Sequence, residues 1–417
     1  MPSRVWHLRG RRCRQMAASA ARGTSRLSSH VSRAVHLAVA AAVLLGAGAL
    51  LAHAFAGVDA RATARAVLRM GPAAPLALFP WIAGMAMDAA GMRFVLVAMG
   101  RRVRHASLVL VRVATEALHM TAPAGFLVSD SMTASLLATR EGVPLADGAV
   151  LAVGRKWLVT RAHAAYIVLG AALGAEALTA ISRRDLGGAW LAWAIAASAL
   201  VPLGLSLGLG LGFRGYGALV RIQSALAKVP NDSFRRRVAA WREHASAGDA
   251  TLRRVGAARD LTWSATACFF CCWLFEAVDT VVILRLLGVP LDFGFAMGAE
   301  VAISLLRSAG NVLPAGLGVQ DAGYAALLSA MGVAPDAAAA FVVVKRGKEL
   351  VWIAGGYALL AVLRRLPSRT AASVAFGTFG APAAPAVSSG VAGRRVEAVA
   401  HAPHAANEGR GVPELLA

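Results

Sequence analysis

The sequence predicts an all-α polytopic membrane protein with about six to eight membrane segments, two of them re-entrant or broken hairpins in inverted repeats. Three observations predict this fold. Of 417 residues, 58% are hydrophobic and 16% are charged, and the mean hydropathy is +0.60. Apolar runs of membrane-spanning length alternate with short basic segments. One stretch of the chain recurs, in recognisable form, in the second half.

The charge balance supports the same class. Soluble domains average about 25% charged residues, so a soluble globule of this length would lack the polar residues to cover its surface. The net charge is +21, but the basic residues gather between the apolar runs, as in cytoplasmic loops. No basic patch is interleaved with aromatic residues, so nucleic acid is not an expected partner. Cys268, Cys271 and Cys272 share one apolar run without nearby histidine, so they are expected to be small helix-packing residues rather than zinc ligands or disulfide partners. No metal and no cofactor are expected.

The N-terminal part predicts a cytoplasmic start. Residues 1–34 contain eight arginines and no acidic residue, and an apolar run at 34–57 follows as a first span. A signal peptide with a small-residue cleavage site at 52–54 is the alternative. Arg61, Arg65 and Arg69 are spaced four apart, which predicts a short amphipathic helix lying on the headgroups.

The remaining chain divides into spans, interruptions and one long basic loop. Spans are expected near 74–100, 148–175, 187–212, 261–287 and 337–363, and interrupted segments at 105–140, 294–309 and 310–331. Residues 213–260 hold ten basic and four acidic side chains, which predicts a helical cytoplasmic loop against anionic lipid. The membrane domain then covers 35–365. Residues 366–417, rich in Ala, Pro, Ser and Gly, are expected to be a disordered tail.

An internal repeat is the most informative feature. Residues 123–130 (PAGFLVSD) match 314–321 (PAGLGVQD), Gly142-Val143 match Gly332-Val333, and Arg155-Lys156 match Lys345-Arg346. Three expected spans separate the copies, and because three is odd, repeat 1 (about 105–175) and repeat 2 (about 294–363) face opposite sides of the membrane. Inverted repeats with interrupted helices are typical of membrane transporters.

The interruptions are expected to be turns at membrane depth. Proline removes a backbone donor and glycine permits tight turns, so the chain reverses at Pro123, Gly125, Pro314, Gly316 and Gly318. The helix after each turn aims free N–H groups at a cavity suited to an anion such as phosphate. Asp130 and Asp321 are candidates either for helix capping or for contact with substrate or a proton.

Charged residues inside the spans are the candidate binding site. A charge at the bilayer centre costs roughly 2.5–3.5 kcal/mol or more, so it normally meets a partner or a cavity. One hypothesis is that Arg155, Lys156, Lys345 and Arg346 bind a lipid phosphate, and the alternative is that they snorkel to the interface. The remaining candidates are an in-helix pair of Glu349 with Lys345 or Arg346, a pair of Glu116 with Arg307 across the repeats, and a proton relay at Glu276 and Asp279 with Arg285 as partner.

The segment from Leu313 to Asp321, with Gly332-Val333 and Arg346 after it, resembles the transmembrane region of lysylphosphatidylglycerol synthases. That flippase-like family includes a hopanoid-biosynthesis-associated branch and has a motif of the form Pro-Gly-Gly-x-Gly-x-x-Glu. This chain has Ala315 for the first Gly of the pair and Asp321 for the Glu. The resemblance covers about 35–365. It implies an inner-membrane protein that moves or presents phospholipids or hopanoids, without the aminoacyltransferase domain of the synthases.

The expected function is therefore a lipid translocator in the cell inner membrane, with both termini in the cytoplasm. No nucleotide-binding, metalloprotease or serine-hydrolase motif is found, so the chain is expected to be no enzyme and to lack an ATP site. Membrane lipids, and lipid-biosynthesis enzymes, are the expected partners. The alternatives are a membrane-embedded transferase using Glu276, Asp279 or Glu116 as acid or base, and a scaffold of a lipid-synthesis complex.

Overall fold

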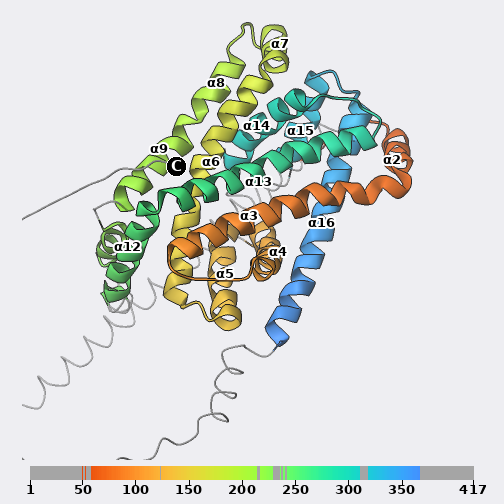
Figure 1. Ribbon diagram of the computed structural model, residues 1–417. Helices are drawn as coiled ribbons and strands as arrows, with labels where there is room; N and C mark the ends of the chain where they lie inside the picture. Colours follow the sequence, from red (N-terminus) through yellow and green to blue (C-terminus); the bar gives the residue numbers. More distant parts are fainter. Residues whose placement is uncertain are drawn as a thin grey trace, which may run out of the picture. The chain divides into compact units, whose positions relative to one another are not determined.

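The computed structural model describes residues 58–122, 124–213, 217–228, 242–309 and 318–366, with a few isolated positions besides. These ranges all belong to one compact unit within residues 1–372. They consist of helices and connecting turns, without a β-strand (Figure 1). The basic segment 1–34, nearly all of the first expected span and the tail beyond residue 366 lie outside the described residues.

Three helical stretches are long and apolar enough to cross a membrane. They are Gly71–Ala98, made of the 3-10 helix η1 (Gly71–Leu78) and α3 (Phe79–Ala98), Leu191–Leu211, made of α8 (Leu191–Ser198) and α9 (Leu200–Leu211), and α13 (Arg259–Leu286). A fourth joins α6 (Leu145–Leu173) to α7 (Ala175–Asp185), which bends away from it by 70°. The helices expected near 74–100, 148–175, 187–212 and 261–287 are thus confirmed, and the chain is a multi-pass all-α membrane protein.

The last expected span is the helix α16 (Pro335–Arg365), which has 31 residues. It is not among the apolar spans, because the charged residues Lys345, Arg346, Lys348 and Glu349 lie in its middle. A helix of this length with a charged centre is costly in lipid unless those charges face protein. Its charges therefore point to the interior of the bundle as the place to look for a site.

The helices outside the spans also follow the sequence. The amphipathic helix is α2 (Ala60–Arg69), in which Arg61, Arg65 and Arg69 are exposed while Thr63 and Ala66 are buried. The described part of the basic loop forms α10 (Ala218–Leu226) and α12 (Arg242–Ala257). Helical structure in this loop is therefore confirmed.

Repeat 1 contains a helical hairpin whose two ends meet. Its arms are α4 (His105–Thr121) and α5 (Gly125–Glu141), of 17 residues each. Glu141 at the end of α5 accepts a hydrogen bond of 2.5 Å from Ser107 in the first turn of α4. Each arm is about 25 Å long, shorter than a hydrocarbon core of about 30 Å. The expected break at 122–125 is therefore confirmed as the turn of a hairpin that begins and ends at one side.

The turn of this hairpin depends on glycine. Ala124 has a φ of 51°, in the left-handed region, and α5 begins directly after it. A Cβ at Gly125 would overlap the backbone carbonyl of His119, so the two arms approach more closely here than any other residue allows. Pro123 lies outside the described residues.

Repeat 2 has the corresponding hairpin in α14 (Phe293–Ala309) and α15 (Val319–Ala330). Its turn, with Pro314 and Gly316, lies outside the described residues. Gly318, the last residue before α15, has a φ of 82°, which a residue with a side chain adopts only with strain. Both hairpins therefore continue into their second arm through a residue in an unusual backbone conformation.

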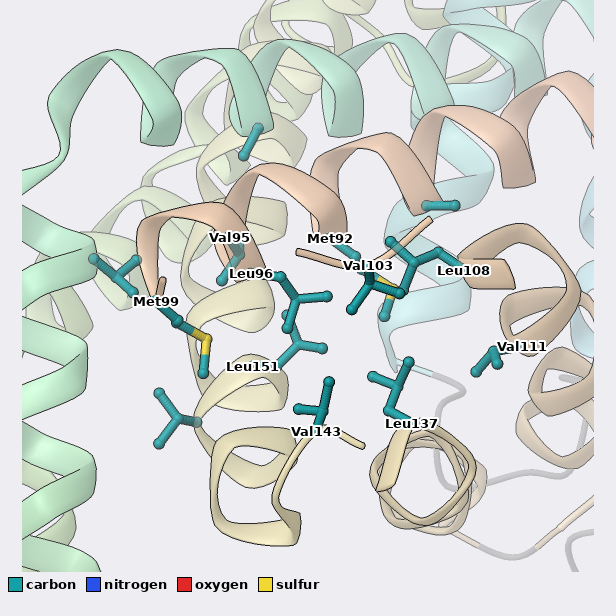
Figure 2. Close-up of a cluster of buried hydrophobic side chains, with 14 of the residues drawn as sticks. Met92, Val95, Leu96, Met99, Val103, Leu108, Val111, Leu137, Val143 and Leu151 are labelled. Carbon is teal, nitrogen blue, oxygen red and sulfur yellow. The ribbon is translucent and has the colours of Figure 1, made fainter. Parts of the chain in front are cut away.

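The two repeats have equivalent hydrophobic cores. Figure 2 shows the first, which includes Met92, Leu96, Leu108, Leu137, Val143 and Leu151. The second core includes, at the equivalent positions, Ile283, Leu287, Ala299, Leu328, Val333 and Phe341. Because α3 and α13 contribute to these cores, the repeat unit reaches further toward the N-terminus than the sequence match: it covers α3 to α6 and α13 to α16.

The first helices of the two units cross in opposite directions. α3 and α13 lie side by side (Figure 1), with Gly84 against Phe275 and Gly91 against Phe269, so the numbering rises along one helix as it falls along the other. Gly84 and Phe275 are themselves equivalent positions. Equivalent residues that touch across an antiparallel pair define a twofold axis between them, which is the arrangement that an inverted repeat requires.

The helix ends gather into two groups. At one end, which we name the basic face, Arg101 binds Asp147 at 2.7 Å and Arg140 donates to the carbonyl of Leu366 at 2.9 Å. These contacts bring together the end of α3, the hairpin ends of repeat 1, the start of α6 and the end of α16. At the other end, the amide of Asp59 donates to Asp336 at 3.2 Å. The basic face carries Arg101, Arg102, Arg104, Arg140, Arg364 and Arg365.

Candidate functional site

A buried ion cluster centres on Asp88 in α3. Its carboxylate, which is 2% exposed, accepts hydrogen bonds from Arg112 of α4 and from Arg155 of α6, the latter at 2.9 Å. Arg112 also donates to Glu116, one turn further along α4, at 2.7 Å. Two guanidinium groups from different helices thus share one carboxylate in a site largely closed to solvent.

A second ion pair lies beside this cluster. Lys156, the neighbour of Arg155 in α6, is 3.6 Å from Asp130 of α5 and lies over the ring of Phe126. Its side chain is 39% exposed, so this pair faces the outside of the cluster. The two basic neighbours therefore bind acids on different helices.

Repeat 2 holds a cluster centred on two acids. Lys345 of α16 is 3.0 Å from Glu300 of α14 and 3.7 Å from Asp279 of α13, and Lys348 also pairs with Asp279. Glu300 accepts further hydrogen bonds from the hydroxyl of Tyr324, at 2.9 Å, and from Thr280. All four charged residues are less than 9% exposed.

The pair beside it again involves the neighbouring base. Arg346 is 2.5 Å from Asp321 of α15 and 2.5 Å from Glu349, one turn along its own helix. Asp321 also accepts a hydrogen bond from the amide of Gly318 at 3.0 Å. The carboxylate thus stabilises the start of α15 while holding a guanidinium.

The same ion-pair pattern occurs in both repeats. In each repeat, an acid on the first helix binds a base on the last helix. An acid on the second arm of the hairpin binds the basic residue that directly follows this base in the sequence. The pairs are Asp88–Arg155 and Asp130–Lys156 in repeat 1, and Asp279–Lys345 and Asp321–Arg346 in repeat 2. Because the repeats are inverted, two polar clusters of similar design approach the middle of the bundle from opposite sides.

Several predictions about single residues are confirmed or corrected. The in-helix pair of Arg346 with Glu349 is confirmed, and so is capping by Asp321. Asp130 is no cap, because the residue before α5 is Ala124 and Asp130 lies more than a turn further on. Snorkelling is wrong for Arg155 and Lys345, which are turned inward to carboxylates on other helices.

Two predicted partnerships also differ. Glu116 pairs with Arg112 of its own helix, and the side chain of Arg307 lies outside what the structure describes. Asp279 pairs with Lys345 and Lys348 rather than with the exposed Arg285. The observed partners of Asp279 differ from the predicted one because the sequence does not show which face of α16 meets α13.

Sequence reasoning missed five members of the clusters: Asp88, Arg112, Glu300, Tyr324 and Lys348. A signal for the first was present, since the interval from Asp88 to Asp279 equals the interval from Asp130 to Asp321. Extending the repeat alignment upstream would have found it. Glu300 has Val109 at the equivalent position, so the repeat carries no signal for it.

Two cavities are lined in part by α5. One of about 10 Å³, the room of about one water molecule, is lined by Arg112, Asp130 and Arg155 among others. The other, of about 300 Å³, lies between α5 and the end of α16 on the basic face. Its lining is Met132, Ser135, Leu136, Thr139, Arg140, Leu363, Arg364 and Leu366. Within the described ranges, no group of three His, Cys, Asp or Glu side chains is placed to hold a metal ion.

The comparison with protein families decides the relationship of this chain. The family model for the transmembrane region of lysylphosphatidylglycerol synthases matches residues 35–356. The chain belongs to this family. The matched range contains both hairpins and both ion clusters, so membership in the lysylphosphatidylglycerol synthase transmembrane family indicates a function related to membrane lipids. Searches of curated proteins and of solved structures found no significant match.

Proposed function

We propose that this protein is a translocator of phospholipids or hopanoid-type lipids in the cell inner membrane. The observation that carries the proposal is the pair of inverted, buried ion clusters, one in each repeat. Related clusters that face the centre from opposite sides suit a substrate that must be bound alternately from each leaflet. We propose no enzymatic role, and the geometry favours a transferase less, because Glu116 and Asp279 are held in ion pairs.

The clusters offer phosphate a reversible binding site. A guanidinium or ammonium group binds carboxylate and phosphate with similar geometry, so a lipid phosphate can replace Asp130 at Lys156 or Asp321 at Arg346. These outer pairs are more exposed than the inner ones: the side chain of Lys156 is 39% exposed and that of Arg346 is 22% exposed. The outer base of each repeat is therefore the proposed headgroup contact, and the inner base holds the helices together.

The larger cavity is the proposed access point on the basic face. It joins two arginines, Arg140 and Arg364, to the hydroxyl groups of Ser135 and Thr139, above apolar walls. Basic pockets between membrane helices on the cytoplasmic side suit anionic lipid headgroups. A phospholipid placed here would keep its phosphate at the arginines and its chains against leucine and methionine.

The distribution of charge supports a cytoplasmic basic face. Short loops rich in Arg and Lys remain on the cytoplasmic side, and the loop 101–104, the loop 213–260 and the end of α16 are all rich in these residues. Both termini are then cytoplasmic, and the helices of the basic loop lie against anionic lipid. Enzymes of lipid biosynthesis are the proposed protein partners on this side.

A vesicle assay tests the proposal. Purified protein is reconstituted with fluorescent phospholipids of different headgroup, and the rate of appearance in the other leaflet is measured. We expect wild type to accelerate movement, and Lys156→Gln with Arg346→Gln to lower the rate at least tenfold while the protein still inserts. Arg184→Gln, which removes an exposed pair with Asp185, is the matched control and should leave the rate unchanged. Equal rates with and without wild-type protein would overturn the proposal.

A further inference from the structure

The two repeats place chemically different cations against equivalent aspartates. Asp88 is paired with the guanidinium groups of Arg112 and Arg155, whereas Asp279 is paired with the ammonium groups of Lys345 and Lys348. Two guanidinium groups hold Asp88, whereas the single ammonium group of Lys345 is shared between Asp279 and Glu300, and Glu300 has Val109 at the equivalent position of repeat 1. The second cluster can therefore protonate one carboxylate, Glu300, while Lys345 keeps Asp279 as its partner.

We propose that the cluster of Asp279, Glu300, Tyr324, Lys345 and Lys348 is a proton-binding site that couples lipid movement to a proton gradient. The equivalent cluster around Asp88 serves as a permanently charged brace. This inference rests on the proposed translocator function and adds the coupling ion to it.

Burial makes proton exchange in this cluster energetically reachable. Asp279 and Glu300 are 2% exposed, and Lys345 and Lys348 are 6% and 8% exposed. In such surroundings an isolated charge is costly, and the advantage of a charged pair over a neutral pair is much smaller than in water. A proton can then bind without leaving an uncompensated charge, provided that a neighbouring charge moves with it.

Lys345 is placed to be that moving charge. Its ammonium nitrogen lies between two carboxylates, 3.0 Å from Glu300 and 3.7 Å from Asp279, and over the ring of Tyr324 at 4.4 Å. Tyr324 and Thr280 both donate hydroxyl hydrogen bonds to Glu300. Glu300 is thus held in position whether or not Lys345 remains bound to it.

Other charged groups near the cluster come from several helices. On α13 itself, Glu276 lies one turn before Asp279 and has interactions of its own. α3 packs on the same helix and brings Asp88 and Arg93, of which Asp88 is bound in the first cluster. α6 presents His163 to Trp273 and to Ser304, which lies one turn after Glu300 on α14. The neighbouring pair on α16 is Arg346 with Glu349 and with Asp321 of α15.

The proposed step moves one proton with one phosphate. A proton from the more acidic side binds Glu300 and neutralises it, Lys345 turns from Glu300 to Asp279, and the lipid phosphate binds Arg346, the outer base beside it. On the other side the phosphate leaves, the proton leaves Glu300, and Lys345 pairs with the carboxylate again. No covalent bond other than the O–H bond forms or breaks. Transport of a monoanionic phospholipid with one proton is electrically neutral.

The test uses the full chain in vesicles with fluorescent phosphatidylglycerol and an imposed gradient of about one pH unit. Coupling of one proton per lipid predicts about a tenfold leaflet ratio at steady state, since one pH unit corresponds to a tenfold ratio. For each variant, lipid movement with the pH gradient is compared with the movement of the same variant without a gradient. We expect Glu300→Gln, which removes the proposed proton-binding carboxylate, to abolish the tenfold bias, and Arg112→Lys with Arg155→Lys to keep it.

The outcomes separate this inference from the translocator function. Rapid movement by wild type without any bias would overturn proton coupling and leave translocation intact. No movement at all would overturn the translocator function and the inference together. A bias that survives in Glu300→Gln would show that the proton binds elsewhere.

Infrared difference spectroscopy supplies a readout that does not depend on transport. Lowering the pH should produce a carboxylic acid band in wild type and in Asp185→Asn, which removes an exposed acid outside the cluster. That band should be lost in Glu300→Gln. A band that persists unchanged in Glu300→Gln would overturn the assignment of the proton to Glu300.

Discussion

Asp88 and Asp279 occupy equivalent positions in the two inverted repeats, and each carboxylate pairs with the equivalent basic residue of its own last helix, Arg155 or Lys345. Both aspartates are about 2% exposed, so each repeat carries a charge at the place where its first and last helices meet. The two repeats therefore share their buried ion pairs as well as their backbone fold and apolar packing.

Removal of Asp88 should destabilise the protein strongly. Asp88→Asn leaves the guanidinium groups of Arg112 and Arg155 buried with less compensation, and breaking a buried pair in this way costs about 3–5 kcal/mol. Thermal unfolding in detergent measures the effect. Asp185→Asn, in an exposed pair with Arg184, is the control and should unfold near the wild-type temperature. A wild-type unfolding temperature for Asp88→Asn would contradict the brace role.

Exchanging the charges of the outer pair Asp321–Arg346 should restore part of the stability that each single substitution loses. Asp321→Arg places two cations together, and Arg346→Asp places that residue beside Asp321 and Glu349, so each single variant should be destabilised. The double variant should recover part of the loss as a double-mutant cycle, with a coupling of about 0.5–3 kcal/mol. Unfolding measurements on all four proteins provide the cycle. If the two single changes in unfolding free energy add up to that of the double variant, the ion pair contributes nothing to stability.

Gly125→Ala should disrupt the first hairpin. The added methyl group would overlap the carbonyl of His119, so the arms of the hairpin must separate. We expect a loss of about 1–3 kcal/mol, the usual cost of overpacking. Gly204→Ala is the matched control, because no atom lies within 4 Å of its added Cβ. If both variants unfold alike, the close approach at the turn is not needed.

Cysteine labelling should place the two groups of helix ends on opposite sides. In a cysteine-free background, Arg102→Cys and Arg364→Cys should react with a membrane-impermeant reagent only from the cytoplasmic side. Arg61→Cys and Arg184→Cys should react only from the other side, because α2 and α7 lie at the opposite end of the bundle. Labelling of all four positions from one side would rule out the inverted arrangement.

Much of the architecture follows from the sequence because its causes are local. Apolar runs long enough to span lipid must become helices, since every backbone polar group in the bilayer needs an internal partner. Gly125 and Gly318 mark the hairpin turns because the close approach at Gly125 and the positive φ at Gly318 both require a residue without a Cβ. The matching segments, separated by three spans, were sufficient to predict that the repeats are inverted.

The identity of each ion-pair partner was decided by the tertiary structure. Lys345 and Arg346 are neighbours in the chain, yet a step of one residue turns a helical side chain by about 100°, so they meet acids on different helices. Which acids they meet depends on how α13, α14 and α15 pack around α16, and contacts between segments far apart leave no mark in a local pattern. For the same reason, the sequence does not distinguish Glu300 from an isolated polar residue in an apolar run, and only packing shows that it binds Lys345.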